Sequence, residues 1–189
     1  MRVVVITPPQ PVITREQAKA HLNVDHDDDD TLIDIYVAAA VGHIDGPDGW
    51  LGRSLGRQTL EARFDTFETD GGDLALSCGP VVELVSIGWT GADRLPRVGD
   101  PALVDLIDNA LCFDGLAPWT GMRVGREVLK VRYVAGYETL PPAIRSALLL
   151  MVGDLYRFRE TSSDQGVTPI AIPMSTTVTN LLNPLRLYG

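Results

Sequence analysis

The sequence has little cysteine and no long apolar run, and each absence narrows what the protein can be. Cys78 and Cys112 are the two cysteines, and neither belongs to a C-x-x-C motif or a histidine cluster. Both lie in expected strands, where a disulfide across a sheet is possible. Two buried free thiols are favoured, because no export signal accompanies them. The apolar runs Val3–Ile6 and Ala147–Val152 are too short for a signal peptide and a membrane span. We therefore expect a soluble protein made in a cytoplasm.

The sequence offers little in the way of local enzyme motifs. It contains no H-E-x-x-H and no G-x-x-x-x-G-K-[ST] pattern. The spacing G-x-S-x-G occurs once, as G-R-S-L-G at 52–56, in a glycine-rich segment that follows a predicted helix rather than at the strand-to-helix turn that a catalytic serine of this motif occupies. Basic residues are few, since 16 Lys and Arg against 25 Asp and Glu give a net charge of −9. That balance disfavours a protein that grips nucleic acid by its phosphates, although it allows a surface past which DNA slides. No catalytic residue and no cofactor is predicted.

The most informative feature that is present is a run of four aspartates, Asp27–Asp30, which leads into the apolar segment Leu32–Val41. Acidic residues suit the first turn of a helix, where backbone N–H groups are unpaired, so the run predicts a helix start. The apolar segment has no polar face wide enough for a simple surface helix. We expect this helix to be covered on more than one side, by its own domain or by a neighbouring subunit.

A metal site is the competing interpretation of these acids. Asp25, Asp27 and Asp29 have the alternate spacing of a calcium loop. However, Asp30 stands where that loop requires glycine, and Tyr36 stands where it requires glutamate. Consecutive carboxylates on a helix also point about 100° apart and do not converge on one ion without other elements. No metal ligand is therefore predicted. A metal-dependent hydrolase or nuclease that uses the Asp25–Asp34 carboxylates is kept as the alternative function.

The periodicity of apolar residues predicts an α+β fold, with a helical frame from both chain ends and an inserted antiparallel β-sheet region in the middle. Thr14 and Gln17 form a capping box at the first helix. Short, closely spaced strands with no helix between them should pair antiparallel, and Asp108-Asn109 suits a hairpin turn. The expected bounds are helices at about 14–22, 27–44 and 142–159 and a β insertion at about 57–135.

The chain is expected to divide into a domain at 1–160 and a C-terminal part at 161–189, which has a flexible loop and then a short helix. The apolar residues of this helix follow the loop and are hypothesised to dock on another subunit or a different protein. They are Val178, Leu181, Leu182 and Leu185. The opposite arrangement, in which the helix folds back onto its own frame, stays open. Residues that widen the apolar face of the two long helices are hypothesised to lie at subunit interfaces, namely Leu32, Ile35, Ala39, Leu149 and Val152.

Four blocks of sequence carry a family resemblance. They are T-R-E-Q-A-K-A-H-L-N-V-D-H-D-D-D-D-T-L-I at 14–33, G-R-Q-T-L-E-A-R-F-D at 56–65, V-R-Y-V-A-G-Y at 131–137 and P-A-I-R-S-A-L-L-L-M-V-G-D-L-Y at 142–156. Taken in order, they resemble the head–tail connector family of tailed phages. Similar proteins, often called adaptors, occur in prophages and gene transfer agents. The resemblance covers about 12–160, but the segment Gly46–Gly56 looks expanded and 91–125 is hard to match.

The resemblance implies a structural protein of the virion neck, made and assembled in the host bacterial cytoplasm, rather than an enzyme. It implies a ring, typically a dodecamer, between the portal protein and the stopper or tail completion protein. DNA would pass through the ring without sequence-specific binding, and no membrane contact is implied. A net charge of −9 suits a channel that repels DNA, so acids that face the lumen are a further hypothesis.

Overall fold

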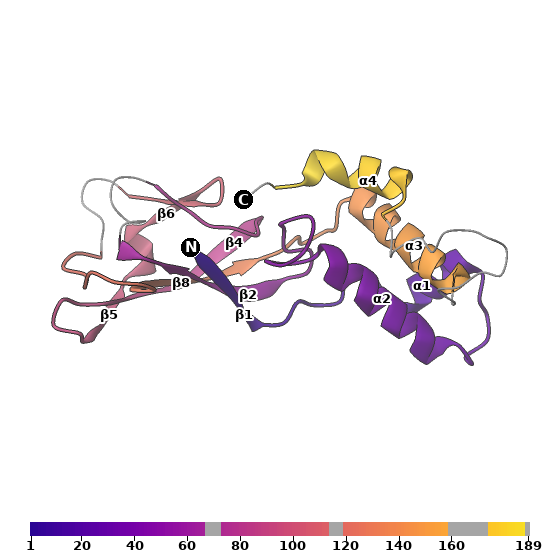
Figure 1. Ribbon diagram of the computed structural model, residues 1–189, viewed down its shortest axis with the longest axis horizontal. Coiled ribbons are helices and arrows are strands. Elements are labelled where there is room, and N and C mark those ends of the chain that lie inside the picture. Colours follow the sequence, from indigo (N-terminus) through magenta and orange to yellow (C-terminus); the bar gives the residue numbers. More distant parts are fainter. Residues whose placement is uncertain (67–72, 114–118, 159–173, 188–189) are drawn as a thin grey trace.

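The computed structural model describes residues 1–66, 73–113, 119–158 and 174–187 of the 189-residue chain. The molecule is elongated, with the helices at one end and the strands at the other (Figure 1). The α+β fold predicted from the sequence is confirmed. The flexible loop predicted after residue 160 falls within 159–173 and lies outside the described residues.

The helices begin and end where local signals place them, with one exception. Helix α1 (Arg15–Leu22) has the predicted capping box, because the Thr14 side chain accepts from the Gln17 backbone N–H and the Gln17 side chain accepts from the Thr14 backbone N–H. Helix α2 (Asp30–Ile44) starts three residues later than predicted. The Asp30 N–H donates to the Asp27 carbonyl at 3.2 Å, so Asp27 belongs to a turn before the helix. Helices α3 (Pro142–Arg157) and α4 (Thr176–Leu182) complete this end.

These helices share one apolar core. Helix α1 contributes Ala18, and α2, α3 and α4 each contribute buried side chains at the spacing of a helix face. The buried members from α2, α3 and α4 are Ile33, Ala40, Ile44, Ile144, Ala147, Leu148, Met151, Val152, Val178 and Leu182. Helix α4 therefore belongs to the helical core of its own chain. None of the helices in the described ranges has the length and apolar content needed to cross a bilayer.

The larger sheet has five strands in the order β1-β2-β8-β4-β5, and every neighbouring pair is antiparallel. Its strands are β1 (Arg2–Thr7), β2 (Gln58–Phe64), β4 (Val81–Thr90), β5 (Pro96–Gly99) and β8 (Leu129–Ala135). The inserted sheet region was predicted, but β1 comes from the N-terminus and pairs with β2. The chain end that was expected to be merely extended is an edge strand.

A second sheet of three strands has the order β3-β7-β6, with β3 at Leu74–Ala75, β6 at Asp105–Ile107 and β7 at Ala110–Cys112. Short 3-10 helices, η2 (Pro101–Leu103) and η3 (Asn183–Leu185), precede β6 and follow α4. The predicted hairpin is confirmed, since Asp108 and Asn109 join β6 to β7 with φ of +48° and +65°.

Both sheets contribute to a second apolar core, which includes Phe64, Ile87, Leu111 and Val131. Cys78 lies in this core and Cys112 is half-buried, and both thiols are free, as favoured from the sequence. Burial raises the pKa of the Cys78 thiol to about 11. This thiol is therefore protonated at neutral pH, which suits a packing role.

Candidate functional site

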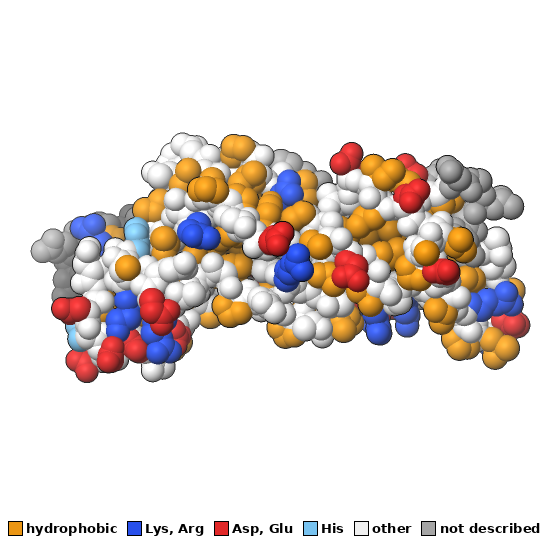
Figure 2. Space-filling view, turned by 180° about the vertical axis from the view of Figure 1, so that it is seen from behind, with side chains coloured by type: hydrophobic (Ala, Val, Ile, Leu, Met, Phe, Trp, Pro, Cys, Tyr) orange, Lys and Arg blue, Asp and Glu red, His pale blue; other side chains and the backbone are white. Residues whose placement is uncertain are grey.

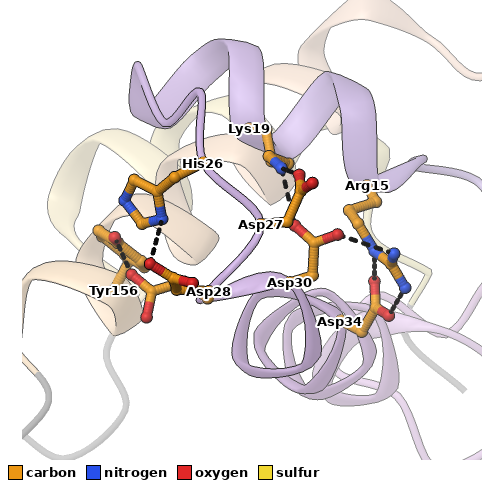
Figure 3. Close-up of polar contacts among 9 residues, drawn as sticks. Arg15, Lys19, His26, Asp27, Asp28, Asp30, Asp34 and Tyr156 are labelled. Carbon is orange, nitrogen blue, oxygen red and sulfur yellow. Dashed lines mark hydrogen bonds and ion pairs between the residues drawn. The ribbon is translucent and has the colours of Figure 1, made fainter.

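The aspartate run forms an ion-pair cluster with two cations of α1 (Figure 3). Arg15 Nε donates to Asp34 Oδ1 at 2.9 Å, and its Nη1 donates to Asp30 Oδ2 at 3.0 Å. Lys19 Nζ lies 2.7 Å from both Asp27 Oδ1 and Asp30 Oδ1. We call this set, Arg15, Lys19, Asp27, Asp30 and Asp34, the acidic corner. It joins the α1–α2 turn and the first turns of α2 to α1.

The cations keep these carboxylates charged. The hydrogen bond from Arg15 lowers the pKa of Asp34, and the hydrogen bond from Lys19 lowers the pKa of Asp27. In return, the hydrogen bonds from Asp27 and Asp30 raise the pKa of Lys19. The acidic and basic side chains of the acidic corner lie at the helical end of the molecule. Figure 2 shows red and blue side chains side by side there, at its lower left.

Two further acids of the run have other surroundings. Tyr156 Oη donates to Asp29 Oδ2 at 2.5 Å, which ties the start of α2 to α3. Asp28 points outward, with its side chain 96% exposed and 3.9 Å from His26 Nδ1. The side chain of Asp27 is 89% exposed despite its bond to Lys19.

This geometry bears on the metal interpretation of Asp25–Asp34. Asp30 and Asp34 turn toward Arg15, Asp27 toward Lys19, and Asp29 toward Tyr156, so these carboxylates point at different partners. Within the described ranges, no group of three or more His, Cys, Asp or Glu residues is arranged to hold an ion. The arrangement has a structural effect, since it holds three helices together. The ion pairs join α1 to α2 and the turn before it, and the Tyr156 hydrogen bond joins α3 to the start of α2.

A second ionic group lies on the outer face of the five-stranded sheet. The buried carboxylate of Glu61 accepts from Arg132 Nε at 2.7 Å and from Arg63 Nε at 2.8 Å. Burial raises the pKa of Glu61, but the hydrogen bonds from Arg132 and Arg63 outweigh it and leave that pKa below its ordinary value. Glu127 then bridges Arg63 to Arg2 of β1 at 3.2 Å each. This group connects β1, β2 and β8 across their outer face.

The expanded segment at 46–56 has a role that sequence reasoning missed. The Leu187 N–H donates to the Leu51 carbonyl at 3.0 Å, and Arg53 Nε donates to the Leu185 carbonyl. The guanidinium of Arg186 stacks over the Trp50 ring, 4.2 Å from its centre. We call these contacts between residues 50–53 and 185–187 the C-terminal clasp. The glycine-rich composition of 46–56 was the available signal, since it was recognised as unusual but given no partner.

Residues 13–87 match the model of the phage gp6-like head-tail connector family. The matched range contains α1, α2, the acidic corner and β2–β3. The resemblance identified from the four sequence blocks is thereby confirmed. No curated protein matches the chain.

Chains in solved structures of gene transfer agent (GTA) particles share the fold of this protein. In "Virion of native gene transfer agent (GTA) particle", the identity is 18% and the TM-score 0.73. In "Neck of native GTA particle computed with C12 symmetry" the values are 17% and 0.73, and in "Neck of empty GTA particle computed with C6 symmetry" they are 16% and 0.71. Each comparison covers 100% of this chain and 97% of the other. At such identity, these likenesses show the fold.

The five residues hypothesised to lie at subunit interfaces differ in their exposure. Ile35 is 57% exposed on α2, and Ala39 is exposed on the same helix. Leu32 is half-buried, and Leu149 is half-buried against the helical core. Val152 is buried inside that core, because it lies on the face of α3 that packs within its own chain.

The residues of α4 that were hypothesised to dock on a partner pack within their own chain in this structure. Val178 and Leu182 are fully buried in the helical core, so in this arrangement they are not open to a partner. The cause is the packing of α4 on α3, which the C-terminal clasp reinforces. Leu181 and Leu185 are half-buried. The fold-back arrangement left open from the sequence is the one observed.

Proposed function

We propose that this protein is a structural head–tail connector of a phage-like particle. Copies form a ring in the neck, between the portal protein and the stopper or tail completion protein, and DNA passes through the ring. The observation that carries this proposal is the family match at 13–87, which lies within a fold shared end to end with chains of GTA necks and virions.

The surface of α2 supports assembly from copies of the chain. Ile35, Ala38, Ala39 and Gly42 are all exposed, and they follow one another at helical spacing without a charged side chain among them. An exposed helix face on a monomer normally carries charged and polar residues. A neighbouring copy that covers this face removes the mismatch. Ile35 and Ala39 were already hypothesised at a subunit interface, and they stay so.

The exposed acids suit the passage of DNA. Asp25, Asp27 and Asp28 project from the α1–α2 turn, and the whole chain has a net charge of −9. Negative charge along a bore repels phosphates, so DNA slides without being retained. We assign these acids to the lumen. A map of the assembled ring with a neutral or basic bore would reject that assignment.

The proposal is tested by deleting the gene in the cell that makes the particle. Without the connector, we expect DNA-filled heads and free tails to accumulate, and supply of the chain from a plasmid to restore joined particles. Imaging of the restored necks should show rings of this chain, twelve copies by the family expectation, between the portal and the next ring. Normal tailed particles in the deletion strain would refute the connector function.

A further inference from the structure

The five-stranded sheet has two open edges. β1 pairs with β2 alone and β5 pairs with β4 alone, and among the described residues no strand is added beyond either. An edge strand presents unpaired backbone N–H and C=O groups, which form a template for another strand. Two different edges on one sheet also provide the two distinct, complementary surfaces that a cyclic ring requires.

β1 is an edge without the usual protection. Proteins commonly blunt an exposed edge with lysine, proline or an inward-pointing charge. The strand reads R-V-V-V-I-T, so after Arg2 it contains no charge and no proline. Val5 and Ile6 are each 42% exposed. A groove of about 570 Å³ lies along the strand, and Pro47, Asp48, Ser77 and Cys78 also line it. β1 is therefore an accessible edge whose own side chains after Arg2 carry no charge.

β5 is the second exposed edge, and Pro96 at its first position has no N–H to donate, so its remaining residues would supply the donors for a partner strand. Pro96, Arg97 and Val98 are all exposed, and Val98 reaches 80% exposure. Four successive antiparallel pairings separate β5 from β1, so the two strands run in the same direction. The neighbour's β5 would therefore lie parallel to β1.

We infer that β5 of one copy pairs with β1 of the next, so that one sheet continues around the ring. This inference rests on the proposed ring and names the contact that closes it. Five strands at a spacing of about 4.8 Å occupy about 24 Å of arc. Twelve such copies make a circle roughly 90 Å across, which leaves an open centre for DNA. We assign the partner of β1 to a second copy of this chain, because the other open edge of the same sheet, β5, can supply the pairing strand.

Cross-linking tests the pairing at two positions on one face of the sheet. Val4 pairs with Glu61, which pairs with Arg132 in β8. Val98 pairs with Gly88, which pairs with Lys130, two residues before Arg132 in the same strand. Residues two apart in a strand share a face, so Val4 and Val98 project to the same side. Val4→Cys and Val98→Cys are combined in a Cys112→Ser chain and incorporated into particles. A bis-maleimide that tolerates a shift of two residues, roughly 7 Å, then links adjacent strands.

We expect a ladder of covalently linked copies from the double variant and none from either single variant. The matched control combines Val134→Cys with Val98→Cys, because Val134 lies on the same face but in the central strand β8. Particles that contain the chain but give no ladder would overturn the pairing and leave the connector function intact. A link from Val4→Cys to a different neck protein would also overturn it. Absence of the chain from particles would refute the proposed function, and the pairing with it.

Discussion

Glu61 is a buried carboxylate, whereas glutamate side chains are usually exposed to solvent. Its carboxylate has an exposed fraction of 3% and is neutralised by two guanidinium groups rather than by water. Removal of one member of such a group leaves the remaining charges poorly paired and costs more than the pair itself contributes. Since the side chain of Arg132 is 51% exposed, water compensates part of that loss.

Glu61→Ala should therefore lower the free energy of unfolding by about 1–3 kcal/mol. The matched control is Glu83→Ala, an exposed carboxylate on β4, for which a change within about 0.5 kcal/mol is expected. Urea denaturation of the two variants measures both values. Equal effects at the two positions would show that the buried ion group contributes nothing specific.

Gly52 is fixed by its contact with the C-terminal clasp. It has φ of +65°, and a Cβ at this position would lie 2.8 Å from the Leu187 carbonyl oxygen. Gly52→Ala should destabilise the fold by about 1–3 kcal/mol, through backbone strain and loss of the clasp. Gly42→Ala, in the interior of α2 with open space around it, should instead stabilise by about 0.5–1 kcal/mol.

Thermal unfolding of the isolated chain measures both glycine variants. Hydrogen exchange at the Leu187 amide, which donates to Leu51, reports the clasp directly. Fast exchange in Gly52→Ala with unchanged exchange in Gly42→Ala is the expected pattern. Unchanged protection of that amide in Gly52→Ala would contradict the role assigned to the clasp.

At the scale of elements, the acidic corner couples α1 to α2 in a pH-dependent way. Asp34 has a pKa below its ordinary value of 3.8 because Arg15 donates to it, and Asp27 has a lowered pKa because of Lys19. A carboxyl whose pKa is lower in the folded state than in the unfolded state stabilises the fold above the ordinary pKa. That stabilisation is lost as the pH falls through the folded-state pKa.

Thermal unfolding of the wild-type chain should thus shift to lower Tm as the pH falls below about 4, because the pKa values of these folded-state carboxyls lie below 3.8. Arg15→Ala should reduce the part of this shift that Asp34 causes, while Lys19→Ala should reduce the part due to Asp27. NMR titration should find the pKa of Asp34 returned toward 3.8 in Arg15→Ala. An unchanged Asp34 titration in that variant would refute the pairing in solution.

The features that could be predicted from the sequence depend on contacts between residues that are close together in the chain. The Thr14–Gln17 capping box and the Asp108-Asn109 turn are each specified within four residues, and both were found as expected. The burial of Glu61 depends on Arg132, which lies 71 residues away. Alternation along β2 alone places that carboxylate on the solvent side, and only the tertiary fold brings the covering guanidinium groups.

Contacts between residues far apart in the chain explain what the sequence did not predict. β1 pairs with a strand more than fifty residues later, so its own sequence indicated an extended segment without a partner. The spacing of the apolar residues in α4 predicted that one face of this helix is covered. It did not indicate which surface covers that face. That surface is α3, and Val178 and Leu182 are consequently core residues. Helix α2 starts at Asp30 rather than Asp27, because the Asp27 carbonyl accepts from the Asp30 N–H in a turn that precedes the helix.

At the scale of the whole molecule, the uncharged face of α2 is the feature that a single copy leaves unsatisfied. Ile35 is 57% exposed and has no structural role within its own chain that an aspartate would disturb. Ile35→Asp should therefore leave the unfolding free energy of the isolated chain within about 0.5 kcal/mol of wild type. In the proposed ring, the same change would place a charge in the interface between copies, which costs several kcal/mol when the charge is unpaired.

We expect Ile35→Asp chains to be depleted from necks at least tenfold when wild type and variant are expressed together, as measured by peptide mass spectrometry of purified particles. Leu103→Asp provides the matched control, because Leu103 is 67% exposed but lies on η2 at the sheet end, away from α2. Depletion of Ile35→Asp with normal incorporation of Leu103→Asp identifies the α2 face as a contact between copies. Equal incorporation of the two variants would leave the ring to be closed by the sheet edges alone.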